Sequence, residues 1–277
     1  MTRGACTLLL ALTVVFAGCD MHLANLTGRA TDEWTHTYTL TPGGEVRIGN
    51  TNGRVDVEGV DGSTVEIRAE RIAKAATDVG ARELLPRLVI KEDSKPDRVS
   101  VETERMSGIM IGAAFEVRYH VRAPKKAVIN VSSANGVVAL IGLAGRVVAH
   151  TTNGGVSGKE LSGGVDARST NGMVNIDLAS VGSEKISLST TNGGVSLALP
   201  DGARADVSAS CTNGSINVSG LQKFELSEQS RRHVEGRLNG GGTPIELHTT
   251  NGGIRVRSRS MLPVEAESDT PKLKTKG

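Results

Sequence analysis

Apolar and polar residues alternate on both sides of an Asn-Gly dipeptide that recurs along the chain. Counted from the Asn, the residues six and four positions before it are apolar, and the residue two before it mostly carries a small hydroxyl group. The residues three and five after it are mostly apolar, and those in between are mostly polar. Because a period of two is typical of a strand with one buried face, the pattern predicts two short strands around each pair.

The Asn-Gly pairs recur at near-regular intervals. From Asn135 onward, the Asn residues of the Ala-Asn-Gly and Thr-Asn-Gly units are 18, 18, 21, 21 and 38 residues apart, and the last interval is about two periods. We interpret each pair as the turn between two strands, because Gly adopts positive φ without steric cost and Asn tolerates it. The predicted turn residues are Asn52, Gly53, Asn135, Gly136, Asn153, Gly154, Asn171, Gly172, Asn192, Gly193, Asn213, Gly214, Asn251 and Gly252.

Two arrangements of these strands fit the alternation. In a parallel β-solenoid of roughly 18–21 residues per coil, equivalent residues stack on one another. In an antiparallel meander, each Asn-Gly pair closes a two-residue hairpin. The recurring Ser or Thr two residues before the Asn favours stacking, because a hairpin has no use for it. We therefore predict an all-β fold and favour the parallel solenoid, with the antiparallel hairpin meander as the alternative.

The remaining pattern divides the chain into regions. Residues 34–126 alternate less regularly, and we expect longer strands there, beginning with residues 34–40, that cap the stack. Within this region the period changes, which predicts one short helix near residues 77–86, started by Thr77 and disturbed by Pro86.

The tight repeats occupy residues 127–259. Because residues 221–244 interrupt them, we expect one degenerate coil within that stretch. Residues 260–277 are rich in Pro, Glu and Lys and have no pattern, so we expect a disordered tail.

The first residues have the features of a targeting segment. Arg3 precedes an apolar run that is too short to span a membrane. The run ends in Ala-Gly-Cys19, which is similar to the bacterial lipobox and implies a lipidated Cys19. We therefore expect a lipoprotein signal peptide at residues 1–19, a polar tether at 20–33, and an extracytoplasmic, lipid-anchored protein of the bacterial cell envelope.

Composition narrows the choice further. Only 2% of the 277 residues are aromatic, which suits a thin two-layer core of Val, Ile, Leu, Ala and Thr. The net charge is only +2 and the sequence has no basic cluster, so the chain lacks the positive patch that nucleic-acid-binding proteins usually carry.

No residues stand out as catalytic, cofactor-binding or metal-binding. Asp166 and Asp177 lie in one repeat, and we interpret them as solvated surface charges. The six His have no metal-ligand spacing, and Cys211 fits a small buried position. A catalytic carboxylate pair would need acids on adjacent coils, and we find none in the outward column of Asn130, Val148, Asp166, Ser187, Ser208 and Glu246.

Taken together, the signal with Cys19, the β-rich first part with one helix and the serial Thr-Asn-Gly units resemble one known family. This is the bacterial putative-adhesin β-strand-repeat family, also called the toastrack domain, and the resemblance covers roughly residues 34–258. It implies an extracytoplasmic scaffold or adhesive module and brings no set of functional residues.

Our first functional hypothesis is a non-enzymatic, lipid-anchored module that presents a stacked polar β surface to a glycan or an envelope protein. The alternatives are a polysaccharide-active enzyme of the β-helix type and an accessory of an envelope-stress sensing system.

Overall fold

The computed structural model describes residues 26–104 and 112–261. The predicted signal peptide with Cys19, the first part of the predicted tether and nearly all of the predicted tail lie outside these residues.

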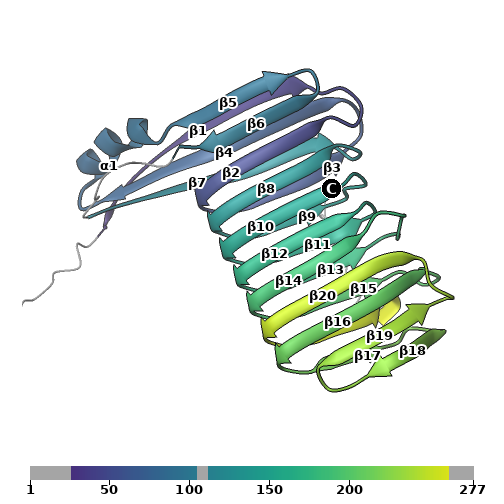
Figure 1. Ribbon diagram of the computed structural model, residues 1–277. Coiled ribbons are helices and arrows are strands. Elements are labelled where there is room, and N and C mark those ends of the chain that lie inside the picture. The colour runs from purple at the N-terminus through teal and green to yellow at the C-terminus, as the bar shows by residue number, and fades with distance from the viewer. Residues whose placement is uncertain (1–25, 105–111, 262–277) are drawn as a thin grey trace, which may run out of the picture.

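Within the described ranges, the strands form two facing sheets, and the shorter strands repeat like the rungs of a ladder (Figure 1). Sheet A has ten strands, in the spatial order β1 (Gly28–Thr39), β4 (Thr64–Ala75), β7 (Ala113–Pro124), β3 (Val55–Val60), β9 (Val138–Ile141), β11 (Val156–Leu161), β13 (Val174–Leu178), β15 (Val195–Leu199), β21 (Ile254–Ser258) and β17 (Ile216–Ser219). Sheet B has eleven, in the order β18 (Phe224–Gln229), β19 (His233–Leu238), β16 (Ala205–Asn213), β20 (Thr243–Asn251), β14 (Ile186–Asn192), β12 (Val165–Asn171), β10 (Val147–Asn153), β8 (Val128–Asn135), β2 (Glu45–Asn52), β6 (Arg98–Thr103) and β5 (Ile90–Lys95).

Each predicted Asn-Gly turn carries the chain from sheet B to sheet A. The strand before the pair, such as β12, pairs in parallel with β10, and the strand after it, such as β13, pairs in parallel with β11. Equivalent residues are in register, so that Asn153 lies beside Asn171. The predicted parallel solenoid is therefore confirmed, and the alternative antiparallel meander is wrong.

The core is the thin layer between the two sheets. The predicted inward residues are buried: Val174 and Ile176 of β13 are both 0% exposed. Val174 lies between Val156 and Val195 of the neighbouring strands, so like side chains stack on like. No single coil can bury these side chains alone, because their contacts come from the coils on either side.

The N-terminal part has longer strands, as expected. Strands β1, β4 and β7 have 12 residues each and pair antiparallel. At their far tip lies the predicted helix, α1 (Asp78–Leu84), where the Thr77 side chain accepts a hydrogen bond from the Gly80 amide (Figure 1). Pro86 lies in the 3₁₀ turn η1 (Leu85–Arg87) that follows, and a second 3₁₀ turn, η2 (Arg259–Met261), follows β21. No helix within the described ranges is long and apolar enough to cross a membrane.

The predicted tether is wrong in its second half. Strand β1 begins at Gly28, six residues before the expected opening strand, and pairs with β4 along its whole length. This part of β1 alternates only weakly in sequence. It is held by contacts between β1 and β4, including a bidentate ion pair between Asp32 and Arg71.

Side chains at the N-terminal end connect the two sheets. The Tyr38 hydroxyl of β1 donates a hydrogen bond to Glu92 Oε2 of β5 at 2.5 Å, and His36 Nδ1 lies 2.7 Å from the same oxygen. The ring of Trp34 stacks on His36, with 4.3 Å between ring centroids. Since β1 and β5 are the edge strands of their sheets, this contact closes one end of the stack.

The C-terminal end differs from the prediction. Residues 221–244 do not form a degenerate coil: β18 and β19 form an antiparallel hairpin that ends sheet B. The last coil, β20 with β21, instead lies between β14–β15 and β16–β17. The turn between β18 and β19, residues 230–232, has no Asn-Gly pair, and β18 is largely exposed, which suits the end of a sheet. Strand β20 instead alternates cleanly and fits between two neighbours.

Candidate interaction surface

The predicted turn Asn residues form one continuous row along an edge of the stack. Each side-chain amide except that of Asn52, which only accepts, donates to the side-chain oxygen of the Asn in the neighbouring coil, at 2.7 or 2.8 Å. Asn ladders of this kind add stability to stacked parallel strands. The row follows the spatial order of the coils and therefore reads Asn52, Asn135, Asn153, Asn171, Asn192, Asn251 and Asn213.

The hydroxyl two residues before the Asn forms a second row inside the turn. Thr190 Oγ1 donates to the carbonyl oxygen of Gly172 in the preceding coil at 2.8 Å, and Ser169 Oγ donates to Gly154 in the same way. Thr151 and Thr249 repeat the contact. In these four coils the Ser or Thr therefore satisfies a part-buried carbonyl group that the backbone ladder leaves unpaired.

The turn glycines are required mainly by the neighbouring coil. Of the seven, only Gly53, Gly154 and Gly252 have φ between +20° and +160°, so the expected role of positive φ is wrong for the others. A Cβ placed on Gly172 would lie 2.0 Å from the carbonyl oxygen of Gly154. The coils approach so closely at this edge that no side chain fits between them.

The outer face of sheet B carries polar side chains in registered rows. One row crosses the sheet at the position three before each Asn: Ser132, His150, Arg168, Ser189, His248 and Ser210. Beside it lie the exposed Thr residues that precede the Asn. Strands β8, β10, β12, β14 and β20 together form a shallow hollow of about 480 Å³, lined by hydroxyl groups, His150, His248 and Arg168.

The inserted coil changes the spacing of charges on this face. Glu246 of β20 and Asp166 of β12 are now separated by one strand only, which places them about 10 Å apart at the usual strand spacing. Each carboxylate is held by a cation. Asp166 accepts two hydrogen bonds from Arg168, at 2.8 and 2.9 Å, and Glu246 lies 2.6 Å from Lys185 Nζ.

Asp166 and Asp177 are not a pair. Asp166 lies on β12 of sheet B, and Asp177 lies on β13 of sheet A, on the opposite side of the core. Asp177 forms an ion pair with Arg259 Nε at 3.0 Å. Cys211 is buried in the inward hydroxyl position of β16.

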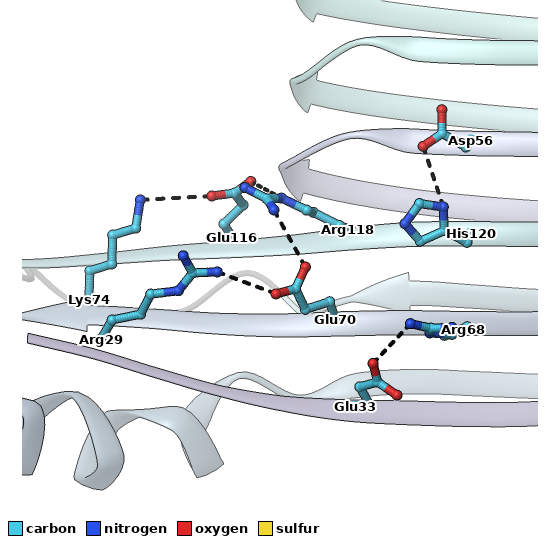
Figure 2. Close-up of polar contacts among 9 residues, drawn as sticks. All are labelled: Arg29, Glu33, Asp56, Arg68, Glu70, Lys74, Glu116, Arg118 and His120. Carbon is cyan, nitrogen blue, oxygen red and sulfur yellow. Dashed lines mark hydrogen bonds and ion pairs between the residues drawn. The ribbon is translucent and has the colours of Figure 1, made fainter. Parts of the chain in front are cut away.

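The outer face of sheet A near the N-terminus is a lattice of paired charges. Figure 2 shows Arg29 and Arg118 on either side of Glu70, at 3.3 and 3.5 Å, and Arg68 joined to Glu33 at 3.0 Å. Further pairs are Lys74 with Glu116 and His120 with Asp56. Because these charges satisfy one another across adjacent strands, this face presents little unpaired charge to a ligand.

A third group lies on the β18–β19 hairpin. Glu228, His233 and Glu235 each offer one ligand atom, and the three atoms lie within 4.8 Å of one another. Sequence spacing did not identify this group. The available signal was His-x-Glu in an alternating strand, since residues two apart share a face.

Comparison with known proteins gives one match to a family model. Residues 127–257 match the model described as Toastrack DUF4097. A comparison with curated proteins finds no match.

Several solved structures are similar to the chain. A putative cell adhesion protein from Clostridium sporogenes ATCC 15579 is 12% identical, with 82% of this chain and 100% of that chain covered and a TM-score of 0.43. A putative adhesin from Bacteroides fragilis NCTC 9343 is 9% identical, with 82% and 97% covered and a TM-score of 0.38.

The family match covers the coils from β8 to β21, which carry every predicted Asn-Gly turn except Asn52-Gly53. The resemblance to the Toastrack family that the sequence suggests is therefore confirmed by the family model over residues 127–257.

Proposed function

We propose that this chain is a non-enzymatic, lipid-anchored module of the bacterial cell envelope, an adhesin or scaffold that presents the outer face of sheet B to a glycan or protein partner. The observation that carries the proposal is the shallow hollow on that face. Five neighbouring strands line it with hydroxyl groups, two imidazoles and a guanidinium.

A glycan chain is the partner that this lining fits best. Hydroxyl groups both donate and accept hydrogen bonds, and here they recur at each strand, about 4.8 Å apart. A polymer that lies across the strands meets the same polar groups many times, so that weak contacts add up. Arg168 is already paired with Asp166, which leaves a face without strong net charge for a neutral or weakly charged polymer.

The experiment measures retention of the full chain on peptidoglycan, on surface polysaccharide and on immobilised envelope proteins. We expect binding to at least one of them, and we expect His248→Ala to weaken it because His248 lines the hollow. The matched control is Arg68→Ala, an exposed change on the opposite sheet, which should bind normally. The proposal would be contradicted if the chain bound none of the three materials, or if the two variants bound equally well.

The lipid anchor is tested separately. We expect Cys19→Ser to move the protein from the membrane fraction to the soluble fraction and to abolish metabolic labelling with a fatty acid. Labelling that persists in the variant would refute lipidation at Cys19. It would not bear on the proposed binding surface, which does not depend on the anchor.

A polysaccharide-active enzyme is less well supported. Asp166 and Glu246 face the same side of sheet B, but each is engaged by a cation. Polysaccharide turnover that disappears in Asp166→Asn would replace the proposed function with an enzymatic one.

A further inference from the structure

We propose that Glu228, His233 and Glu235 form a binding site for a divalent transition-metal ion, best suited to Zn²⁺, on the outer face of the β18–β19 hairpin. The site goes beyond the proposed function and does not depend on it. It also departs from the expectation that this chain has no metal ligands.

The distances from His233 to the two glutamates are close to those around a tetrahedral ion. Zn–N and Zn–O distances of about 2.0–2.2 Å place neighbouring ligand atoms of a tetrahedron about 3.3–3.6 Å apart. His233 Nε2 lies 3.3 Å from Glu235 Oε1 and 3.8 Å from Glu228 Oε2. A shift of the exposed Glu228 carboxylate by a few tenths of an ångström brings its 3.8 Å distance to His233 into the same range.

The pairing of the two strands supplies a second, independent argument. Glu228 and Glu235 are directly opposite each other in the antiparallel register, next to an irregularity between Leu226 and Glu228. Like charges at such positions destabilise a strand pair. A divalent cation bound by both carboxylates turns this repulsion into an attraction that joins the edge strand β18 to β19.

No positively charged side chain of the neighbouring strand lies beside the site. Ser210 of β16 lies beside His233, and Ser208 lies beside Glu235, so the neighbouring strand adds no positive charge. The two arginines of the turn, Arg231 and Arg232, form no ion pair with these glutamates in the part of the chain that the structure describes. Arg232 donates instead to the Thr212 carbonyl at 3.2 Å.

The donor set decides the class of metal. An imidazole with two carboxylates suits Zn²⁺ and its first-row neighbours, whereas Ca²⁺ and Mg²⁺ prefer six or more oxygen ligands. Three protein ligands leave a fourth position, which water fills. We therefore expect a site that stabilises the end of sheet B and still has an open coordination position.

The experiment titrates Zn²⁺ into the chelator-treated full chain by calorimetry and measures thermal unfolding with and without the ion. We expect one saturable site per chain and a higher unfolding temperature with Zn²⁺. His233→Gln and Glu235→Gln should each weaken binding about tenfold or more, because even the outer partners of metal ligands contribute tenfold or more to affinity. His120→Gln is the matched control, since His120 lies near a single carboxylate, 3.5 Å from Asp56, and should bind normally.

Thermal unfolding of the metal-free protein shows whether a variant loses zinc binding because a metal-binding side chain is gone or because the fold is damaged. Glu235→Gln removes a like-charge contact, so its unfolding temperature without metal should equal or exceed that of the parent chain. The proposal is overturned if Zn²⁺ shows no saturable binding, if both hairpin variants bind as the parent does, or if His120→Gln alone loses binding.

Discussion

Thr190→Val tests the role of the hydroxyl row. The Thr190 side chain is 3% exposed, and its hydroxyl donates to the Gly172 carbonyl at 2.8 Å. Valine keeps the shape of the side chain and removes only the donor. The carbonyl then loses the only hydrogen bond that the described structure gives it. A fully buried acceptor left without a partner costs about 1–3 kcal/mol, and this range sets the upper limit for the part-buried Gly172 carbonyl.

The chain provides two matched controls. Thr191 is the next residue and faces solvent, so Thr191→Val should change stability by less than about 0.5 kcal/mol. Thr190→Ser keeps the hydroxyl, and Ser169 makes the same contact in the preceding coil at 2.8 Å. We therefore expect Thr190→Ser to retain most of the stability that Thr190→Val loses.

Urea unfolding followed by far-ultraviolet circular dichroism measures these differences. In a thermal scan, a loss of about 1–3 kcal/mol lowers the midpoint by roughly 2–12 °C for a domain of this size. Equal midpoints for Thr190→Val and Thr191→Val would show that the hydroxyl contributes nothing to the coil contact. A Thr190→Ser variant as unstable as Thr190→Val would show that the methyl group matters and the hydrogen bond does not.

Three further predictions follow from the packing and the end of the stack. Val174→Asp should cost several kcal/mol in urea unfolding because it buries an unpaired charge, whereas Asn175→Asp on the outer face should cost little; equal midpoints would mean that the inward assignment is wrong. Gly172→Ala should lower the thermal midpoint sharply, because its Cβ would lie 2.0 Å from a backbone oxygen of the preceding coil, and a midpoint like that of the parent would argue against this close approach. The hydrogen bond from Tyr38 lowers the pKa of Glu92 below its ordinary 4.5. This contribution to stability is therefore present above the unfolded-state pKa and lost as the pH falls through the lower folded-state pKa, so Glu92→Gln should destabilise at pH 7 and have little effect at pH 2. A cost that is the same at both values would contradict the assignment.

The coil itself could be predicted from the sequence, because both faces of each strand are specified by period two. The inward column around Val174 and the small residue at Thr190 have the same reason to repeat in every coil, namely stacking on a neighbour. The same repetition favours parallel pairing over hairpins, because only stacked coils bring like residues together.

The spatial order of the coils could not be predicted, and the reason lies in the same repetition. Since every coil presents nearly the same columns, β20 fits on β14 as well as β16 does, and alternation cannot distinguish the two neighbours. The cluster of Glu228, His233 and Glu235 was missed for a related reason. It depends on the antiparallel register of one hairpin, whereas the expected coil at residues 221–244 would not place these side chains opposite each other.

The role of glycine was only partly predictable. Turn chemistry explains why Asn-Gly can lie between two strands, but the contact that excludes any side chain at Gly172 comes from the coil before it. A local pattern indicates that glycine is tolerated, whereas a contact with a distant segment makes it necessary.

The place of β20 and β21 has a consequence for how the protein is made. The ribosome releases β16 and β17 before the strands that finally separate them from β14 and β15, since synthesis proceeds from the N-terminus. The nascent chain must therefore hold this gap open or break a provisional contact when the last coil arrives. A product that stops before Thr243 keeps unpaired edges on β14 and β16 in sheet B and on β15 and β17 in sheet A, which invite aggregation or proteolysis. The closed stack itself therefore distinguishes finished from unfinished molecules.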